Sequence, residues 1–511
     1  MKNLVRKQPL FVILLPVFFI LHGLVAHAGF ISLNSIWPLL LSMLAGAGIL
    51  YFISRIILKQ PVKAGLFTLY CLGFYFFFGA LYDFLKVWSP WTFLWKYSVL
   101  LAGFTLFAIL LFVLLFRTKK DLSRTALFFN LLFLLFIVFD LVKLSGHYLG
   151  AGKNPSAASG KMIIPSKIHK PDIYLLLFDE YSSTQSLKKM YRFDNSALDS
   201  FLVQQGFHLI SGSRSNYHET MFSMASCLNM DYLHWVEPGM YLRREHFQRC
   251  ASEIRNNEVV QLLSDNGYQI VNQSIFHLKH HPAPVSQRWL NVDTRLITEE
   301  TLMGRLCYEF NWFFERYALF RKILPVTSYQ EQMQNNDRCL EAVLNTSAKQ
   351  HSSPRFIYGH FMLPHYPFYR DRNGKIAPDS VVNGVQQNRL DPLPKYLEYV
   401  QYANIEIKKL IAGIRANDPQ AVILFMSDHG YRWNVMAAEI SNVFYNQNAI
   451  YLPSGKYGQF YDSITNVNQF RTLFNTLFEQ HYKLLPDNCV RTALPGIYKP
   501  VPKYEDTPAS K

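Results

Sequence analysis

The chain of 511 residues carries 51 Lys and Arg against 36 Asp and Glu, a formal net charge of +15, and half of its residues are hydrophobic. Residues 1–150 hold 13 of the basic residues and 3 of the acidic ones, so most of the net charge lies in a strongly apolar part of the chain. Proteins that bind nucleic acid carry their basic residues on a polar surface. Here these residues lie between hydrophobic runs, which excludes a nucleic-acid partner.

Five hydrophobic runs occupy the first 150 residues, and each is close to the roughly 20 residues that cross a bilayer. They span Leu10–Val25, Trp37–Leu58, Gly65–Leu85, Trp95–Phe116 and Ala126–Val142. The first run resembles a signal peptide, because basic residues precede it. Four further runs follow, so we interpret it as the first of five membrane helices.

The loops between these runs indicate the orientation of the helices. Ten basic residues fall on one side of the membrane: Lys2, Arg6, Lys7, Arg55, Lys59, Lys63, Arg117, Lys119, Lys120 and Arg124. Only Lys86, Lys96 and Lys143 fall on the other side. Since basic loops stay in the cytoplasm, we expect a multi-pass protein of the cell membrane with a cytoplasmic N-terminus. After five crossings, the rest of the chain is extracytoplasmic.

The ionisable residues of these runs, Asp83, Asp140 and Lys143, lie near predicted helix ends, where they reach the interface. This favours a membrane anchor over a transport path. The anchor is expected to cover residues 1–147, and a linker rich in Gly, Ser, Ala and Pro covers 148–170.

Residues 171–511 form the second predicted domain, in which short apolar runs alternate with helix-like segments. The runs 172–178, 356–362, 421–427 and 448–453 are typical of interior strands. Segment 256–272 is predicted as a helix, a glycine cap and a strand, and 396–416 as a long amphipathic helix. The expected fold is an α/β domain, with a mainly parallel sheet and helices on both faces.

Chemically capable residues follow several of these strands, at the sheet edge where active sites of such folds gather. Asp179 and Glu180 follow the first strand, and Asp428 and His429 follow the third. Acidic pairs and Asp-His-Gly are also common in turns, but carboxylate and imidazole together are suitable metal ligands. The strand 356–362 adds His360, and the loop after it adds His365. Each histidine is either a packed core residue or part of a site.

The segment "HETMFSMASCLNM", residues 218–230, places Thr220 before small and apolar residues that predict a buried helix. Thr220 is therefore either only the start of that helix or a reactive group at its amino end. Asn216 precedes this segment and Asn229 lies near its end, on either side of Thr220, where they either line a pocket or stabilise turns.

Four segments in this order resemble the sulfatase-like branch of the alkaline phosphatase superfamily: "KPDIYLLLFDEY", "SNYHETMFSMASCLNMDYL", "GHFMLPHYPF" and "ILFMSDHG". The resemblance covers about residues 170–480. With its five-helix anchor, the chain looks most like lipoteichoic acid synthases and the phosphoethanolamine transferases of cell envelopes.

The resemblance implies that Asp179, Thr220, Asp428 and His429 surround one divalent metal ion, which is manganese, zinc, magnesium or calcium. Glu180 corresponds to a further acidic ligand of sulfatases. It implies that His365 contacts the transferred group, and that His360 matches a histidine of the phosphoethanolamine transferases. In the members that transfer phosphorus groups, the threonine is the nucleophile and forms a phosphothreonine.

One departure separates the possible relatives. Sulfatases oxidise a Cys or Ser within C/S-x-P-x-R, whereas "TMFSM" here has Thr220 at the nucleophile position and lacks the Pro and Arg. Phosphate esters of envelope lipids or glycans are therefore the favoured substrates. A sulfuric ester hydrolase and an inactive domain that binds the envelope are the alternatives.

The cysteines leave the disulfide question open. Cys71 lies in a predicted membrane helix, which leaves five residues outside the cytoplasm: Cys227, Cys250, Cys307, Cys339 and Cys489. Because five is odd, at least one of them has no partner within the chain.

Overall fold

The computed structural model describes residues 8–27, 31, 33–150, 162–242, 244–284, 294, 297–314, 317, 319–320, 329–386, 390–432 and 437–493. The chain divides into two compact units. The first combines residues 1–154 with 286–328, and the second combines 155–285 with 329–511.

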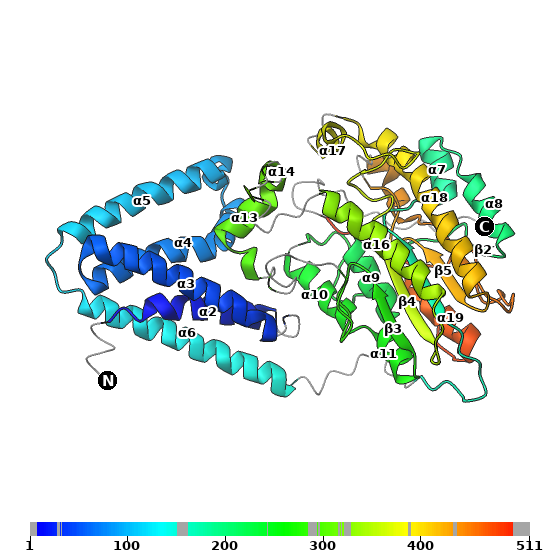
Figure 1. The fold of residues 1–511 in the computed structure, drawn as a ribbon, viewed down its shortest axis with the longest axis horizontal. Helices are drawn as coiled ribbons and strands as arrows, with labels where there is room; N and C mark the ends of the chain where they lie inside the picture. The colour runs from blue at the N-terminus through cyan, green and yellow to red at the C-terminus, as the bar shows by residue number, and fades with distance from the viewer. Residues whose placement is uncertain are drawn as a thin grey trace. The chain divides into compact units, whose positions relative to one another are not determined.

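The five predicted apolar helices are all present in the first unit (Figure 1): α2 (Phe11–Ala26), α3 (Leu33–Leu58), α4 (Pro61–Trp88), α5 (Tyr97–Arg117) and α6 (Ser123–Gly150). A short 3₁₀ helix, η1 (Thr92–Trp95), joins α4 to α5. Helices α3 to α6 are long and apolar enough to cross a membrane, and α2 is shorter, with 16 residues. Their large apolar side chains are widely exposed, as in helices that face lipid.

An insert from the second half of the sequence folds with these helices. It includes α13 (Leu302–Glu309) and α14 (Asn311–Phe314). The Gly79 N–H of α4 donates to the Glu300 carbonyl, and Arg305 forms an ion pair with Asp83 of α4 at 2.5 Å. The predicted boundaries, 1–147 and 171–511, assign this insert to the other domain. No local sequence pattern in the insert indicates that it packs on the membrane helices, because this packing depends on tertiary contacts.

The second unit contains a six-stranded sheet in the order β2-β6-β5-β1-β4-β3. The strands are β1 (Ile173–Phe178), β2 (His208–Leu209), β3 (Gln269–Gln273), β4 (Arg355–Phe361), β5 (Val422–Met426) and β6 (Asn448–Tyr451). Strands β3, β4, β1 and β5 pair in parallel, which confirms the mainly parallel prediction. Strand β6 is antiparallel to β5, and the 3₁₀ helix η2 (Ala437–Phe444) lies in the connection between them.

The two faces of β1 belong to two hydrophobic cores, because successive side chains of a strand point to opposite faces. One core takes Ile173, Leu175 and Leu177, and the other takes Tyr174, Leu176 and Phe178. The first core is covered by α9 (Thr220–Asn229), α10 (Arg244–Arg255), α11 (Glu258–Asp265) and α19 (Asn466–Phe478). The second is covered by α7 (Thr184–Tyr191), α8 (Ser196–Gln204), α16 (Tyr329–Ser347), α17 (Asp379–Gln386) and α18 (Pro392–Asn417). Helices cover both faces of the sheet, as predicted. A site on this sheet can therefore form only where the strands begin or end.

A buried ion pair holds the amino ends of the three central strands together. Arg355, the first residue of β4, donates from Nε to Asp172 Oδ2 at 2.7 Å and from its backbone N–H to Oδ1 at 2.8 Å. The Asp172 carbonyl accepts from the Val422 N–H, the first residue of β5, at 2.8 Å. One aspartate thus fixes β1 against both neighbours, and their carboxyl ends meet at the opposite edge.

Replacing this arginine is expected to destabilise the second unit. Arg355→Met leaves the Asp172 carboxylate buried without its guanidinium partner, which costs about 3–5 kcal/mol of unfolding free energy. Denaturant unfolding of the full chain in detergent, followed by fluorescence, measures the loss. Lys395→Met, which breaks the more exposed Lys395–Glu398 pair, is the control and is expected to cost about 1 kcal/mol or less. Equal losses of unfolding free energy in the two variants would contradict a stabilising role for the Arg355–Asp172 ion pair.

Candidate active site

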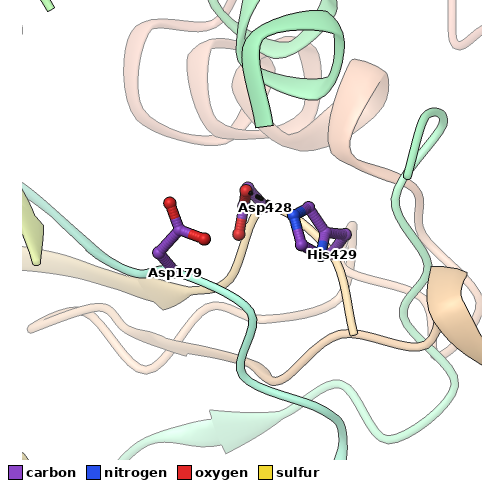
Figure 2. Close-up of side chains that lie close together, drawn as sticks. All are labelled: Asp179, Asp428 and His429. Atoms are coloured by element: carbon purple, nitrogen blue, oxygen red, sulfur yellow. Dashed lines mark ion pairs between the residues drawn. The ribbon is translucent and has the colours of Figure 1, made fainter. Parts of the chain in front are cut away.

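Three potential metal ligands converge at the carboxyl edge of the sheet. Asp179 directly follows β1, and Asp428 and His429 follow the neighbouring strand β5 by one connecting residue. Each residue offers one ligand atom, and these atoms all lie within 4.8 Å of one another. All three residues are buried, and Figure 2 shows their side chains gathered at one place. The structure thus brings together three of the residues that the sequence suggested as metal ligands, and their ligation stays a prediction.

The hydrogen bonds of His429 determine which ring nitrogen carries a hydrogen. Nδ1 lies 2.8 Å from the Gly430 carbonyl, which only accepts, so Nδ1 is the donor. In the neutral ring, Nε2 then has a free lone pair, and it lies 3.1 Å from Asp428 Oδ2. Two acceptor atoms at this distance repel each other unless a cation or a proton lies between them.

Among the residues that the structure describes, three buried carboxylate oxygens have no hydrogen-bond partner: Asp179 Oδ1, Glu180 Oε2 and Asp428 Oδ2. Such orphaned charged oxygens are costly in a protein interior unless they bind a cation. Two carboxylates and one imidazole match the ligand preferences of several divalent metals. Asp179, Asp428 and His429 therefore fit a divalent metal ion.

His360 of β4 holds Asp179 in place. The carboxylate can only accept, so His360 Nε2–H donates to Asp179 Oδ2 at 3.0 Å, and Nδ1 accepts from the Tyr358 hydroxyl at 3.0 Å. Burial by itself raises the pKa of Asp179, but the nearby His365, His360 and His429 outweigh it and leave this pKa well below the usual range. Asp179 is therefore a carboxylate at neutral pH, oriented in the way that neighbours of metal ligands usually provide.

Glu180 lies beside the group of three and has an unusual backbone. Its φ is +62°, a left-handed conformation that costs a non-glycine residue about 1–2 kcal/mol. Its N–H donates to Asp428 Oδ1 at 3.0 Å, and the Tyr396 hydroxyl donates to its carbonyl at 2.9 Å. His365 Nε2 lies 3.8 Å from Glu180 Oε2, so this histidine reaches the same edge. Ligation by Glu180 stays a prediction.

Thr220 begins α9, as expected, with its hydroxyl at the site. Its Oγ1 lies 3.2 Å from His429 Nε2. The Ser223 hydroxyl, one turn later, donates to the Asp428 carbonyl at 2.7 Å and ties the helix to the metal ligands. The N-cap Glu219 makes no side-chain capping bond. The amino end of α9 and its dipole thus favour an anion beside Thr220.

Arg432 is a site residue that sequence reasoning did not identify. Its guanidinium donates to Glu219 Oε2 at 2.7 Å and to the His218 carbonyl at 3.1 Å, and its backbone N–H donates to Glu180 Oε1 at 3.1 Å. Burial lowers the pKa of Arg432, but Glu219 and Glu180 outweigh it and raise this pKa above its usual value. The only sequence signal was its place two residues after "SDHG".

His218, two residues before Thr220, contributes no charge to the site. Burial, reinforced by the positive charge of nearby Arg432, lowers the pKa of His218 to about 3. The ring is therefore neutral at physiological pH.

The two asparagines on either side of Thr220 are structural. Asn216 donates to Tyr232, Thr465 and the Asn488 carbonyl and accepts from the Val467 N–H. Asn229 donates to carbonyls of α9 and α10. None of the six cysteines, which all lie in the described part of the chain, forms a disulfide.

Comparison with known families identifies the second unit. Residues 218–471 match the family model described as Sulfatase, a range that contains Thr220, His360, His365, Asp428 and His429. We use the name sulfatase-family domain for the part of the second unit that contains this match. The resemblance to the sulfatase-like branch of the alkaline phosphatase superfamily is thereby confirmed. No curated protein matches the chain in sequence.

Several solved structures are similar to the sulfatase-family domain at low sequence identity. The C-terminal periplasmic domain of EcEptC from Escherichia coli is 11% identical, with 66% of this chain and 90% of that chain covered and a TM-score of 0.39. The soluble domain of lipooligosaccharide phosphoethanolamine transferase A from Neisseria meningitidis is 13% identical over 62% and 90%, with a TM-score of 0.39. The phosphonate monoester hydrolase of Agrobacterium radiobacter is 13% identical over 60% and 74%, with a TM-score of 0.37.

A divalent metal is expected to stabilise the sulfatase-family domain through the three ligands. At a free concentration near 100 times the dissociation constant, binding adds about 2.7 kcal/mol to the unfolding free energy. Asp428→Asn is expected to abolish this gain, while Asp265→Asn, on the exposed side of α11, retains it. Thermal unfolding with chelator and with each metal in turn measures the effect. A gain that persists in Asp428→Asn would place the metal elsewhere.

Arg432 is expected to act by positioning Glu219 and Glu180. Arg432→Met leaves the Glu219 carboxylate buried without its guanidinium donor and keeps only the backbone N–H bond to Glu180, and metal affinity is expected to fall about 10- to 100-fold. Arg432→Lys restores a positive charge without the planar fork, so partial recovery is expected. Titration of metal binding in the full chain checks both variants. Unchanged affinity in Arg432→Met would show that the pair serves only local folding.

Proposed function

We propose that the protein is a membrane-anchored, metal-dependent enzyme that transfers or hydrolyses phosphate esters of cell-envelope lipids or glycans. Thr220 is the nucleophile, and a phosphothreonine is the intermediate. The observation that carries this proposal is the Thr220 hydroxyl, 3.2 Å from His429 Nε2, at the amino end of a buried helix beside Asp179 and Asp428.

In the first half of the reaction, the Thr220 oxygen forms a bond to phosphorus, and the ester bond to the leaving alcohol breaks. The Thr220 hydroxyl loses its proton to solvent, and the leaving oxygen gains one. His365, which is part-exposed at the same edge, is suited to supply that proton or to hydrogen-bond a phosphoryl oxygen. In the second half, an acceptor alcohol or water displaces Thr220 and restores its hydroxyl.

Asp179, Asp428 and His429 would hold a divalent ion, with Thr220 beside it, and such an ion lowers the pKa of a hydroxyl and neutralises phosphoryl charge. The chain's own groups support this chemistry. His360 orients Asp179, Arg432 offsets the charge of Glu219, and the N–H groups at the start of α9 favour an anion. Buried surroundings strengthen each of these interactions.

Sulfate ester hydrolysis is the second candidate, and the family match favours it. The chemistry of the nucleophile position argues against it, because Thr220 cannot form the oxidised group that sulfatases derive from Cys or Ser. Cys227, the nearest cysteine, is fully buried on α9, and burial raises the pKa of its thiol to about 12. This thiol is therefore inert. An inactive binding domain is disfavoured, because Thr220, Asp428 and His429 are all present and close together.

The proposed location follows from the anchor. Four helices are long and apolar enough to cross a membrane. The distribution of basic residues supports a cytoplasmic N-terminus and an extracytoplasmic sulfatase-family domain. Lipids or glycans of the envelope are then the substrates within reach.

Intact mass measurement of the full chain tests the nucleophile. After brief exposure to divalent metal and a chromogenic phosphate ester or a phospholipid donor, we expect a phosphorus-containing adduct on Thr220. Thr220→Ala is expected to lose the adduct and at least about 10³-fold in turnover. Thr476→Ala, which removes a threonine hydroxyl of α19, is the control. Metal-dependent release of sulfate from sulfate esters, without an adduct, would overturn the proposal.

A further inference from the structure

A cavity of about 540 Å³ lies within the first unit, between the membrane helices and the insert. Its wall includes one face of α3, marked by Leu39, Met43, Gly46 and Leu50 at helical spacing. Helix α4 contributes residues 71–76, and α5 contributes Phe104. Thr301, Leu302 and their neighbours in the insert close one side. The volume is within the range of about 300–1,000 Å³ that is typical of ligand sites.

The lining of this cavity suits a hydrocarbon. Leu, Met, Phe and Ala side chains dominate it. Two of its hydroxyls donate to backbone carbonyls, Ser42 to Leu39 at 2.7 Å and Thr301 to Thr298 at 2.6 Å. They therefore offer little to a polar ligand. An ordered water needs two to four polar partners, and these hydroxyls are already engaged.

The surroundings identify the source of the hydrocarbon. The outer face of α3 exposes Leu41 and Ile49, each more than 60% accessible, as expected for a helix surrounded by lipid. The ion pair between Arg305 and Asp83 lies on α4 seven residues beyond Phe76, the last cavity residue of that helix. Seven residues correspond to about 10 Å along a helix. Charged groups mark the level of lipid headgroups, so the cavity lies at the depth of acyl chains.

We propose that this cavity binds an acyl chain of a membrane glycerophospholipid. The insert completes the site, because Thr301 and Leu302 supply the wall that the membrane helices lack. One close contact joins the insert to α4, and a second lies within the insert itself. A Cβ on Gly79 would lie 2.6 Å from Glu300 Oε2, and a Cβ on Gly304 would lie 2.0 Å from the Thr298 carbonyl oxygen. The site is a property of the first unit and does not depend on the proposed reaction of Thr220.

Gly46 offers a direct way to fill the cavity. A Cβ at Gly46 would meet no atom within 4 Å, and the residue lines the cavity, so a leucine there takes the space of the ligand. Gly48 also has no neighbour within 4 Å of its Cβ, but it does not line the cavity. Gly48→Leu is therefore a matched control on the same helix.

The experiment uses the full chain in nanodiscs of phosphatidylethanolamine and phosphatidylglycerol, doped with a phospholipid that carries a photoactivatable group in mid-chain. We expect crosslinks on residues 39–50 and 71–76. Displacing about two methylene groups lowers affinity about tenfold, so Gly46→Leu should reduce these crosslinks about tenfold, and Gly48→Leu should leave them unchanged.

Several outcomes would overturn the proposal. They are equal crosslinking in both glycine variants, crosslinks only on outward-facing residues of α5 and α6, and labelling by a free photoactivatable fatty acid that excess phospholipid does not displace. If Gly46→Leu does not assemble, the crosslink map of the unsubstituted chain decides. The same map is measured in Thr220→Ala. Cavity crosslinks in a chain without phosphoryl-transfer activity would separate the lipid site from the proposed function.

Discussion

The concentration of negative charge at the carboxyl edge of the sheet is the constraint on which the site depends. Asp179, Glu180 and Asp428 are all buried there, and unpaired buried carboxylates are among the costliest groups in a protein. Hydrogen bonds within the described residues meet part of this charge: His360 donates to Asp179, the Arg432 backbone N–H to Glu180, and the Glu180 N–H to Asp428. With Nδ1 donating to the Gly430 carbonyl, His429 Nε2 lies 3.1 Å from Asp428 Oδ2, at a place that suits a cation. The residue types and their hydrogen bonds therefore fit a positive ion beside the Thr220 hydroxyl.

The sheet carries this charge because its opposite edge is fixed. The Asp172–Arg355 pair sets β1 and β4 in register, and the Asp172 carbonyl holds β5. Parallel strands whose amino ends are aligned also have their carboxyl ends close together. The pairing of β1 with β4 and β5 therefore places Asp179 beside the strand of His360 and beside Asp428. The left-handed Glu180 follows from the same geometry, because its N–H must reach Asp428 Oδ1. Its backbone strain is local, and the hydrogen bonds around it offset the cost.

Much of this arrangement was predictable from the sequence, and the reasons are physical. Apolar runs flanked by basic loops and buried strands followed by polar residues are local signals, so the five helices, the parallel strands and the group of Asp179, Asp428 and His429 could be found. Arg432 was missed because its role depends on Glu219 and Glu180, which are distant in sequence. The antiparallel direction of β6 and the two-residue strand β2 depend on the tertiary path of the chain, which no local sequence pattern indicates. The predicted boundaries placed the insert with the second unit, because its short helices contain no apolar run of membrane length.

The insert changes how the two parts of the chain should be regarded. Residues of 286–328 lie between sulfatase-family segments in sequence, yet those that the structure describes pack on α4 through Glu300 and Arg305. A chain cut after the last membrane helix would keep the insert and lose its partners. Leu302 and Met303 would then face water, and Arg305 would lose Asp83. Exposed apolar groups of this kind favour aggregation. The boundary between membrane and soluble parts is therefore a three-dimensional one, and the chemistry of Thr220 is best studied in the whole chain.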